Sequence, residues 1–464
     1  MKYGVIDVGG TGVKAKVYDD NLNVVASTKV KLDLVTTSEG YVEGDPISLV
    51  NALKHVVNWF KEYNVKIAGI ATYRASILAW DRSGAPLTNI ITWLDPRGKD
   101  IVSRPFYRVL KMIPVLGKIL RPDSPAVKIK WLMEDKADLK SKVLRGEAYI
   151  GTLSSYILYL VSKRYANDLT NEALTGLIHP GNLKRLDIVY NLLGIPDVIS
   201  PEIVDNVGHI GSINGVDIVT LIADQQAAII GASCLSPKCL KITSGTGVFV
   251  DAPVEHFFIP RGNVIPLVVY NIRGRRLYAI EGFTSIGGSV IDWLLKIGLI
   301  KDVSELDRVA STSENPIVFI PSLSRTLLPW FRDHGSGLIY GLSLGHDRRD
   351  IVRGALEGIT ITVHGIVSIV EGIAGRRNII RADGGLSNSI VYLRLLASLC
   401  GRSIERIRGA DATSRGVAML IAFYDGKLRF EDFEKIVDID FIAKPGEEGI
   451  KVNMVMWRRA LKWR

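Results

Sequence analysis

Two segments of the sequence repeat one pattern, in which an apolar strand runs through a turn of glycine and threonine into a second strand. In the first, residues 3–7 and 13–18 flank the turn Gly9-Gly10-Thr11-Gly12. In the second, residues 239–243 and 248–250 flank Ser244-Gly245-Thr246-Gly247. Apolar alternation on both sides of a glycine turn predicts a β-hairpin. Two hairpins of this kind, half a chain apart, suggest two related domains.

The remaining elements indicate an α/β fold. Apolar runs predict strands at 24–30, 67–71, 77–80 and 378–382, and helical spacing predicts helices at 47–60 and 348–372. Because 464 residues exceed one ordinary core, we expect an N-terminal domain at 1–232 and a C-terminal domain at 233–464. Residues 99–142 are rich in basic and helix-forming residues, and we expect them to form an insertion on the first domain.

Charge, hydropathy and cysteine content argue against several classes of protein. The net charge is +10, but the basic residues are scattered, so we expect no nucleic-acid partner. Charges or Gly/Pro breaks interrupt every long apolar run, and the N-terminus enters a strand rather than a signal peptide. We therefore expect a cytoplasmic protein without a membrane partner. Cys234, Cys239 and Cys400 form no metal-binding set, and we expect all three to be buried thiols.

The first turn carries the groups that a polyphosphate and its Mg²⁺ require. Gly10 and Gly12 leave backbone amides open to phosphate oxygens, and Thr11 adds a hydroxyl. Asp7 offers a hard carboxylate ligand for Mg²⁺, and Lys14 offers a cation for phosphate. The alternative is a tight turn that needs glycine only for its backbone conformation.

Two later segments have the same chemistry. Gly245 and Thr246 repeat the first turn, and Gly384-Gly385 precede a predicted helix, whose N-terminus would favour an anion. Between the hairpins, Asp224 stands at the end of an apolar strand and opens an apolar helix. A carboxylate there can cap the helix, or it can accept the proton of an attacking hydroxyl.

Taken in order along the chain, these motifs resemble the FGGY carbohydrate kinases, a family that includes glycerol kinases, xylulokinases and ribulokinases. No single motif is decisive, but the ordered set is. The set comprises Asp7 to Lys14, Asp45-Pro46, residues 67–74, Trp93-Leu94-Asp95-Pro96-Arg97, Gly151-Thr152, residues 167–171, Asp224-Gln225-Gln226, residues 244–247, Glu281-Gly282, Gly288 with Trp293, Glu357-Gly358, and Asp383-Gly384-Gly385 with Asn388.

The resemblance implies two ribonuclease-H-like domains, as in actin and hexokinase, around an ATP-binding cleft. It implies that ATP is the phosphoryl donor, with Mg²⁺ as its metal, and that Asp224 is the catalytic base. It further implies that Asp7 organises Mg²⁺ through water, and that Thr11 and Thr246 meet the phosphates. The positions that match the family's contacts to adenosine are Gly288, Gly384, Gly385 and Asn388.

The acceptor pocket is closest in pattern to that of glycerol kinases but departs from it. Arg74 matches an arginine that binds substrate hydroxyls, and the resemblance adds Asp224 and Gln225 as further substrate-binding residues. Ala75 stands where glycerol kinases have a glutamate, and we expect Asp123 to lie close enough to replace that acceptor. A pentulose kinase, a non-catalytic sugar or nucleotide sensor and an ATPase that activates a partner enzyme are the alternatives. A homodimer also stays open.

Overall fold

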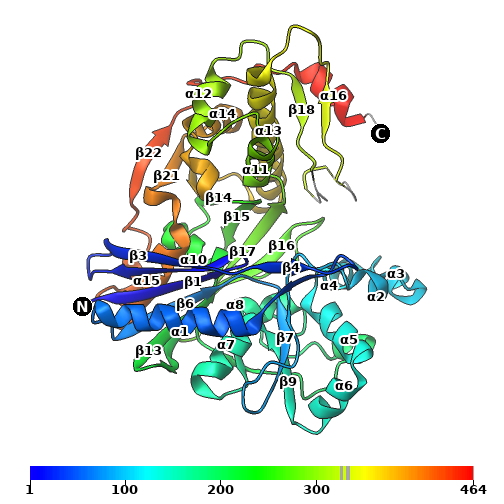
Figure 1. Cartoon of the computed structure of the whole chain (residues 1–464), viewed down its shortest axis with the longest axis vertical. Helices are drawn as coiled ribbons and strands as arrows, with labels where there is room; N and C mark the ends of the chain where they lie inside the picture. The colour runs from blue at the N-terminus through cyan, green and yellow to red at the C-terminus, as the bar shows by residue number, and fades with distance from the viewer. Residues whose placement is uncertain (324–327, 331–334, 463–464) are drawn as a thin grey trace.

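The computed structural model describes residues 1–323, 328–330 and 335–462. It divides into two halves along its longest axis (Figure 1). The N-terminal sheet has the strand order β12-β13-β6-β1-β2-β3 and the C-terminal sheet the order β16-β17-β15-β14-β20-β21-β22. The bounds of these strands are β1 Tyr3–Gly9, β2 Gly12–Tyr18, β3 Val24–Lys31, β6 Ile67–Thr72, β12 Val207–Ile213, β13 Val216–Ala223, β14 Cys239–Ser244, β15 Val248–Val254, β16 Ile265–Ile272, β17 Arg275–Thr284, β20 Ile379–Asp383, β21 Ile404–Ile407 and β22 Ile439–Ala443.

Both sheets contain the same five-strand unit. In the first, β1, β2 and β3 form an antiparallel hairpin series, and β6 and β13 lie parallel to β1 on its other side. In the second, β14, β15 and β17 form the series, and β20 and β21 lie parallel to β14. The two glycine turns therefore occupy equivalent places, which confirms the predicted fold of two related α/β domains. The carboxyl ends of the parallel strands lie at one edge of each sheet, where such sheets commonly bind ligands.

The first half adds a smaller sheet and a set of helices. The smaller sheet has the order β4-β5-β8-β7-β9. The strands are β4 Leu34–Thr36, β5 Val42–Gly44, β7 Ile77–Asp81, β8 Ile90–Ile91, β9 Ala148–Thr152, and the separate pair β10 Ala166–Asp168 and β11 Glu202–Val204. The helices are α1 Pro46–Glu62, α2 Lys99–Val102, α3 Pro105–Leu110, α4 Pro114–Ile119, α5 Pro125–Asp135, α6 Ala137–Leu144, α7 Leu153–Ser162, α8 Leu169–Glu172 and α9 Asp187–Leu193. Helices α2 to α6 form the predicted insertion, and prolines open three of them in the first turn, where a missing amide is tolerated.

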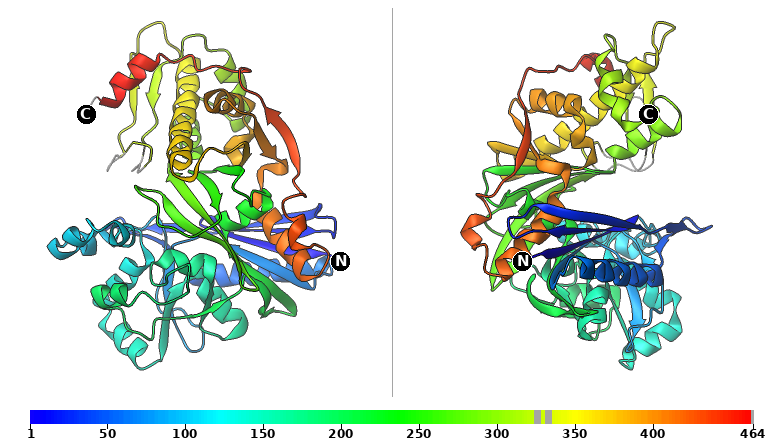
Figure 2. Two further views of the ribbon diagram at one scale, coloured as in Figure 1. Left: turned by 180° about the vertical axis from the view of Figure 1, so that it is seen from behind. Right: turned by 60° about the vertical axis from the view of Figure 1, so that its left-hand side comes forward.

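The remaining helices follow β13 in the sequence. They are α10 Asp224–Gly231, α11 Gly288–Lys296, α12 Leu306–Ser311, α13 Arg348–Ala374, α14 Ile390–Cys400, α15 Ala412–Tyr424 and α16 Met454–Lys462, with the short strands β18 Val318–Ile320 and β19 Leu338–Tyr340. Helix α13 is long and apolar enough to cross a membrane, but 61% of its most apolar window is buried inside the protein. Its position against β15 and β17 indicates the core helix of a folded domain (Figure 2).

Two helices cross between the halves. Helix α10 follows β13, and α15 packs both on α10 and on strands β1 and β6 of the N-terminal sheet. The backbones touch at two glycines: a Cβ at Gly231 would lie 1.9 Å from the Ala412 carbonyl oxygen, and one at Gly416 would lie 1.9 Å from the Ala227 carbonyl oxygen. One apolar cluster joins Tyr3 of β1 to residues of α15. The division at residues 232 and 233 stays a prediction, because α15 packs on the other half.

Gly416→Ala is expected to lower the free energy of unfolding by about 3 kcal/mol, because the added methyl meets backbone that cannot move aside cheaply. Gly372→Ala is the matched control, since a Cβ at this helical glycine of α13 meets nothing within 4 Å and alanine favours helix. Denaturant unfolding of both variants measures the difference. Equal stabilities would contradict a close helix crossing.

The prediction of three free thiols is wrong. Cys234 and Cys239 form a disulfide, and Cys400 is free and buried. The two residues lie on either side of the turn that connects α10 to β14, and this turn brings their Cα atoms to 5.3 Å. A five-residue separation gave no sign of that approach, because spacing alone does not determine which cysteines pair.

Candidate active site

The first glycine turn carries Asp7 and Lys14 on facing strands. They are direct partners in the β1–β2 register, and the Lys14 ammonium lies 3.8 Å from the Asp7 carboxylate. Burial raises the pKa of Asp7 to about 7, against the opposing effect of Lys14. Gly10 and Thr11 lie at the tip, and the Thr11 side chain is exposed. Gly12 also has a packing role, because a Cβ there would lie 2.7 Å from the Val30 carbonyl oxygen.

The second glycine turn is hydrogen-bonded to the start of α11. The Gly288 amide donates to the Gly245 carbonyl oxygen at 2.7 Å, and the Ser289 amide donates to the Thr246 carbonyl oxygen at 3.0 Å. A Cβ at Gly288 would lie 2.9 Å from the same Gly245 oxygen. The turn and the helix N-terminus therefore form one unit, in which the Thr246 side chain is exposed.

The third glycine segment packs on the second turn. Gly384 has a φ of +87°, and a Cβ there would lie 2.6 Å from the Ser244 carbonyl carbon. Beside it, the Thr243 hydroxyl donates to Asp383 at 2.6 Å. The predicted helix does not begin at Gly385: residues Gly385–Asn388 form a 3₁₀ turn, and α14 begins only after Ser389, whose hydroxyl caps it.

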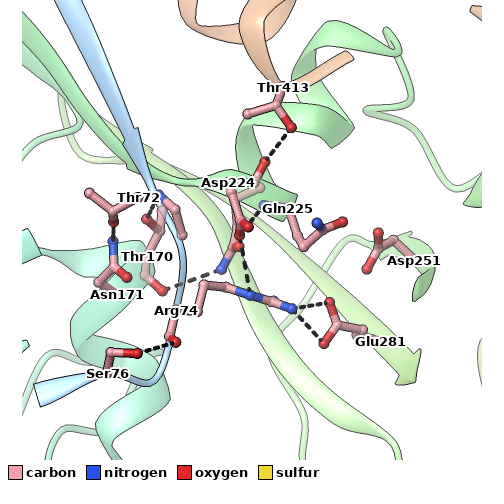
Figure 3. A network of polar contacts seen from close by, with 12 residues as sticks. Thr72, Arg74, Ser76, Thr170, Asn171, Asp224, Gln225, Asp251, Glu281 and Thr413 are labelled. Carbon is pink, nitrogen blue, oxygen red and sulfur yellow. Dashed lines mark hydrogen bonds and ion pairs between the residues drawn. The ribbon is translucent and has the colours of Figure 1, made fainter. Parts of the chain in front are cut away.

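Asp224 is the first residue of α10, at the carboxyl end of β13. Its carboxylate accepts from the Gln225 amide at 2.7 Å, whereas the N-cap of α10 is Ala223, so helix capping does not explain this acid. The Arg74 Nε lies 3.6 Å from Asp224 Oδ1 (Figure 3). The side chain is 24% exposed. Burial raises the pKa of Asp224 above its ordinary value, opposed chiefly by Arg74.

Arg74 links the two halves of the molecule. It follows β6, and its Nη2 lies 3.1 Å from Oε1 and 2.9 Å from Oε2 of Glu281 in β17. Its guanidinium carbon lies 5.3 Å from the centre of the Phe249 ring. Phe249 stacks on Phe283 at 4.7 Å, and Phe283 meets the edge of Trp93 at 6.0 Å. A cation, a carboxylate and a half-buried aromatic wall thus lie together.

A second buried group supports Gln225. Its side-chain oxygen accepts from the Lys241 ammonium at 3.2 Å, and Lys241 also pairs with Asp251 at 3.1 Å. Lys241 and Asp251 are fully buried. Figure 3 shows Glu281 at the far end of the Arg74 guanidinium and Asp251 on the same side, past Gln225. The sequence analysis did not select Phe249, Phe283, Lys241 or Asp251.

Asp123 makes its ion pair elsewhere. It pairs with Arg121, whereas the buried Lys128 donates to the carbonyl oxygens of Thr92 at 2.7 Å and Ala75 at 3.4 Å. A cavity of about 340 Å³ also lies away from the predicted site, lined by Glu43, Asp45, Pro46, Ile47, Pro86, Leu87, Thr88, Asn89, Ile91, Arg97, Leu132 and Lys136.

Comparison with known proteins identifies the family. Residues 2–232 match the N-terminal domain, and residues 240–424 the C-terminal domain, of the FGGY family of carbohydrate kinases. The chain is 30% identical to a glycerol kinase of Nitrosomonas eutropha over 438 residues, which cover 89% of this chain and 88% of that protein. It is 28% identical to a glycerol kinase of Aquifex aeolicus, covering 99% of this chain and 98% of that protein.

Solved structures agree with this result. A Plasmodium falciparum glycerol kinase with ADP superposes with a TM-score of 0.88 at 25% identity, covering 99% of this chain and 98% of that one. A xylulose kinase of Lactobacillus acidophilus shares the fold, with a TM-score of 0.83 at 20% identity, covering 99% and 96%. The chain belongs to the FGGY family of carbohydrate kinases, and it is an ATP-dependent kinase of a sugar or polyol.

Proposed function

We propose that this kinase phosphorylates a small polyol, with glycerol as the first candidate and Asp224 as the general base. The observation that carries the proposal is the position of Asp224, partly exposed at the carboxyl end of β13 with the Arg74 guanidinium beside it. The Arg74 Nη1 is buried without a hydrogen-bond partner among the described residues, so it is a donor available to an acceptor hydroxyl. The aromatic wall of Trp93, Phe249 and Phe283 suits the carbon chain of such a substrate.

The reaction follows from these roles. Asp224 accepts the proton of the acceptor hydroxyl as its oxygen forms a bond to the γ-phosphorus of ATP. The bond between that phosphorus and the bridging oxygen breaks, and ADP leaves. The glycine turns at Gly10 to Gly12 and at Gly245 to Gly247 offer backbone amides to the phosphates, with Thr11 and Thr246 beside them. Gly288, Gly384, Gly385 and Asn388 remain the proposed contacts to adenosine.

Mg²⁺ fits the site as a metal that arrives with the nucleotide. Among the described residues, no group of three or more His, Cys, Asp or Glu side chains is placed to hold a metal ion. Mg²⁺ usually keeps several waters and binds through one or two carboxylates together with phosphates, where it neutralises phosphate charge. Asp7 is the carboxylate that would hold it, through water.

A longer polyol or a pentulose is the second candidate acceptor. Ala75 has a short side chain at the position where the resemblance places the glutamate of glycerol kinases. The ion pair of Asp123 is with Arg121 and not with Arg74. Whether Asp123 reaches the acceptor stays a prediction. We propose that the enzyme is cytoplasmic and acts on small molecules without a nucleic-acid or membrane partner, and a homodimer stays open.

The test is ADP release with Mg-ATP and a panel of glycerol, erythritol, ribitol, xylulose and ribulose. We expect one acceptor to raise ADP release at least about tenfold over the acceptor-free rate, since positioning by the site should favour the hydroxyl over water. Phosphorus NMR identifies the product. Highest activity on glycerol supports the first candidate, and highest activity on a longer acceptor supports the second. ADP release that no acceptor stimulates would contradict the proposed acceptor class.

A further inference from the structure

Two carboxylates compete for the guanidinium of Arg74. Arg74 Nη2 donates a hydrogen bond to Glu281 Oε1 at 3.1 Å and lies 2.9 Å from Oε2, whereas the Asp224 carboxylate lies 3.6 Å from Nε. The contact with Oε1 is a charge-assisted hydrogen bond, and the distance from Nε to Asp224 is longer than one. Arg74 is therefore bound to Glu281 and only neighbours the proposed base.

Within the part of the chain that the structure describes, the charges around these groups leave Glu281 no other strong partner. It lies in β17 directly opposite Asp251 in β15, and this like-charged neighbour is itself paired with Lys241 of β14. The charged groups that face Glu281 are thus Arg74, Asp251 and Lys241, and those that face Asp224 are Arg74, Lys241 and Asp7. Glu281 is 2% exposed, so water does not replace Arg74 as its partner.

We propose that Glu281 is a positioning residue that holds the Arg74 guanidinium off Asp224, so that the carboxylate of the base stays free to take the acceptor's proton. This inference rests on the proposed function of Asp224. A carboxylate that accepts close hydrogen bonds from arginine is a weaker base, and its oxygens are occupied. Glu281 is thus needed although it touches neither the acceptor nor the nucleotide in the proposed mechanism.

Loss of Glu281 should let Arg74 close on Asp224. In Glu281→Gln the guanidinium loses its buried anionic partner, and Asp224 becomes the nearest carboxylate. We expect the acid limb of the pH profile of kcat/KM to move down by about one pH unit, because a tighter ion pair stabilises the ionised base. We expect kcat on the plateau to fall at least about threefold, because base strength decreases with pKa.

The experiment is a double-mutant cycle of Glu281→Gln and Arg74→Met, with pH profiles of kcat and kcat/KM for the best acceptor. Because Glu281 acts through Arg74, the Gln substitution should shift the acid limb in the wild-type background and not in the Arg74→Met background. An unchanged limb in Glu281→Gln, an increase in the acceptor KM alone, or an equal shift in both backgrounds would overturn the proposal.

Two controls distinguish the proposed effect of Glu281 on Asp224 from a general loss of stability. Glu357→Gln breaks another buried ion pair, with Arg353 in α13, and should lower stability without moving the acid limb. If Glu281→Gln alone does not fold, Arg74→Met is compared with the double variant, which has no unpaired buried charge at this pair. Coincident acid limbs then support the proposal, and separate limbs overturn it. Failure of the proposed function is distinguishable, since turnover retained by Asp224→Asn would exclude the base without any Glu281 variant.

Discussion

Asp224→Asn is expected to reduce kcat at least about a hundredfold, because an amide cannot accept the proton that general-base catalysis removes from the acceptor. ATP affinity should change little, since the proposed nucleotide contacts lie on the glycine turns and near α11. Stability should be unchanged or higher. Burial already disfavours the ionised form of Asp224, so the neutral amide removes a cost that the folded state carries.

The measurement is ADP release with the best acceptor, together with nucleotide binding and thermal unfolding. Asp217→Asn is the matched control, because Asp217 is an exposed acid near the start of β13, the strand whose other end leads into Asp224. It should leave turnover, binding and stability near those of the wild type. If Asp224→Asn kept more than about a tenth of wild-type turnover, the assignment of the base would be wrong.

The sequence predicted those strands and helices that depend on local residue patterns. The strand predicted at 24–30 is found at Val24–Lys31, and the helix predicted at 348–372 is found at Arg348–Ala374. The helix predicted at 47–60 is found at Pro46–Glu62, and the Asp45 side chain caps it. Strand alternation, helix caps and glycine turns depend on neighbouring residues, which explains why they can be read before any tertiary contact is known.

Of the candidate site, only the residues that belong to sequence motifs could be predicted. Asp224 and Arg74 were selected, but Glu281 was noticed only as part of a Glu-Gly motif, and nothing in the sequence connected it to Arg74, 207 residues away. Phe249 and Phe283 face one another because β15 pairs with β17 in a particular register. That register is a property of the assembled sheet, so the sequence showed only the alternation within each strand and not the pairing of Phe249 with Phe283.

The same limit applies to the disulfide. Cys234 and Cys239 meet because a helix and a strand are joined by a short turn, which spacing alone does not reveal. The role of Asp123 at the acceptor stays a prediction, since the ion pair that it makes is with Arg121, two residues away.

Gly384→Ala is expected to lower kcat/KM for ATP by about a hundredfold, because an atomic displacement of about 1 Å at a positioning segment can have that effect. The residue has a φ of +87° and a ψ of 161°, a conformation that is nearly restricted to glycine. An added Cβ would also lie 2.6 Å from the Ser244 carbonyl carbon. The strain and the contact together should displace the second glycine turn, which carries Gly245 and Thr246.

Gly385→Ala is the matched control, since this neighbouring glycine is exposed and a Cβ there would meet nothing within 4 Å. It should retain kcat/KM for ATP within about threefold, because alanine keeps the backbone amide and its methyl group meets no neighbour. Steady-state kinetics at varied ATP, with thermal unfolding of both variants, separates a displaced turn from a loss of folded protein. A Gly384→Ala enzyme that is folded and binds ATP normally would show that this segment does not position the nucleotide. Equal losses in both variants would instead mean that the surface of the 3₁₀ turn, rather than the backbone conformation of Gly384, determines ATP binding.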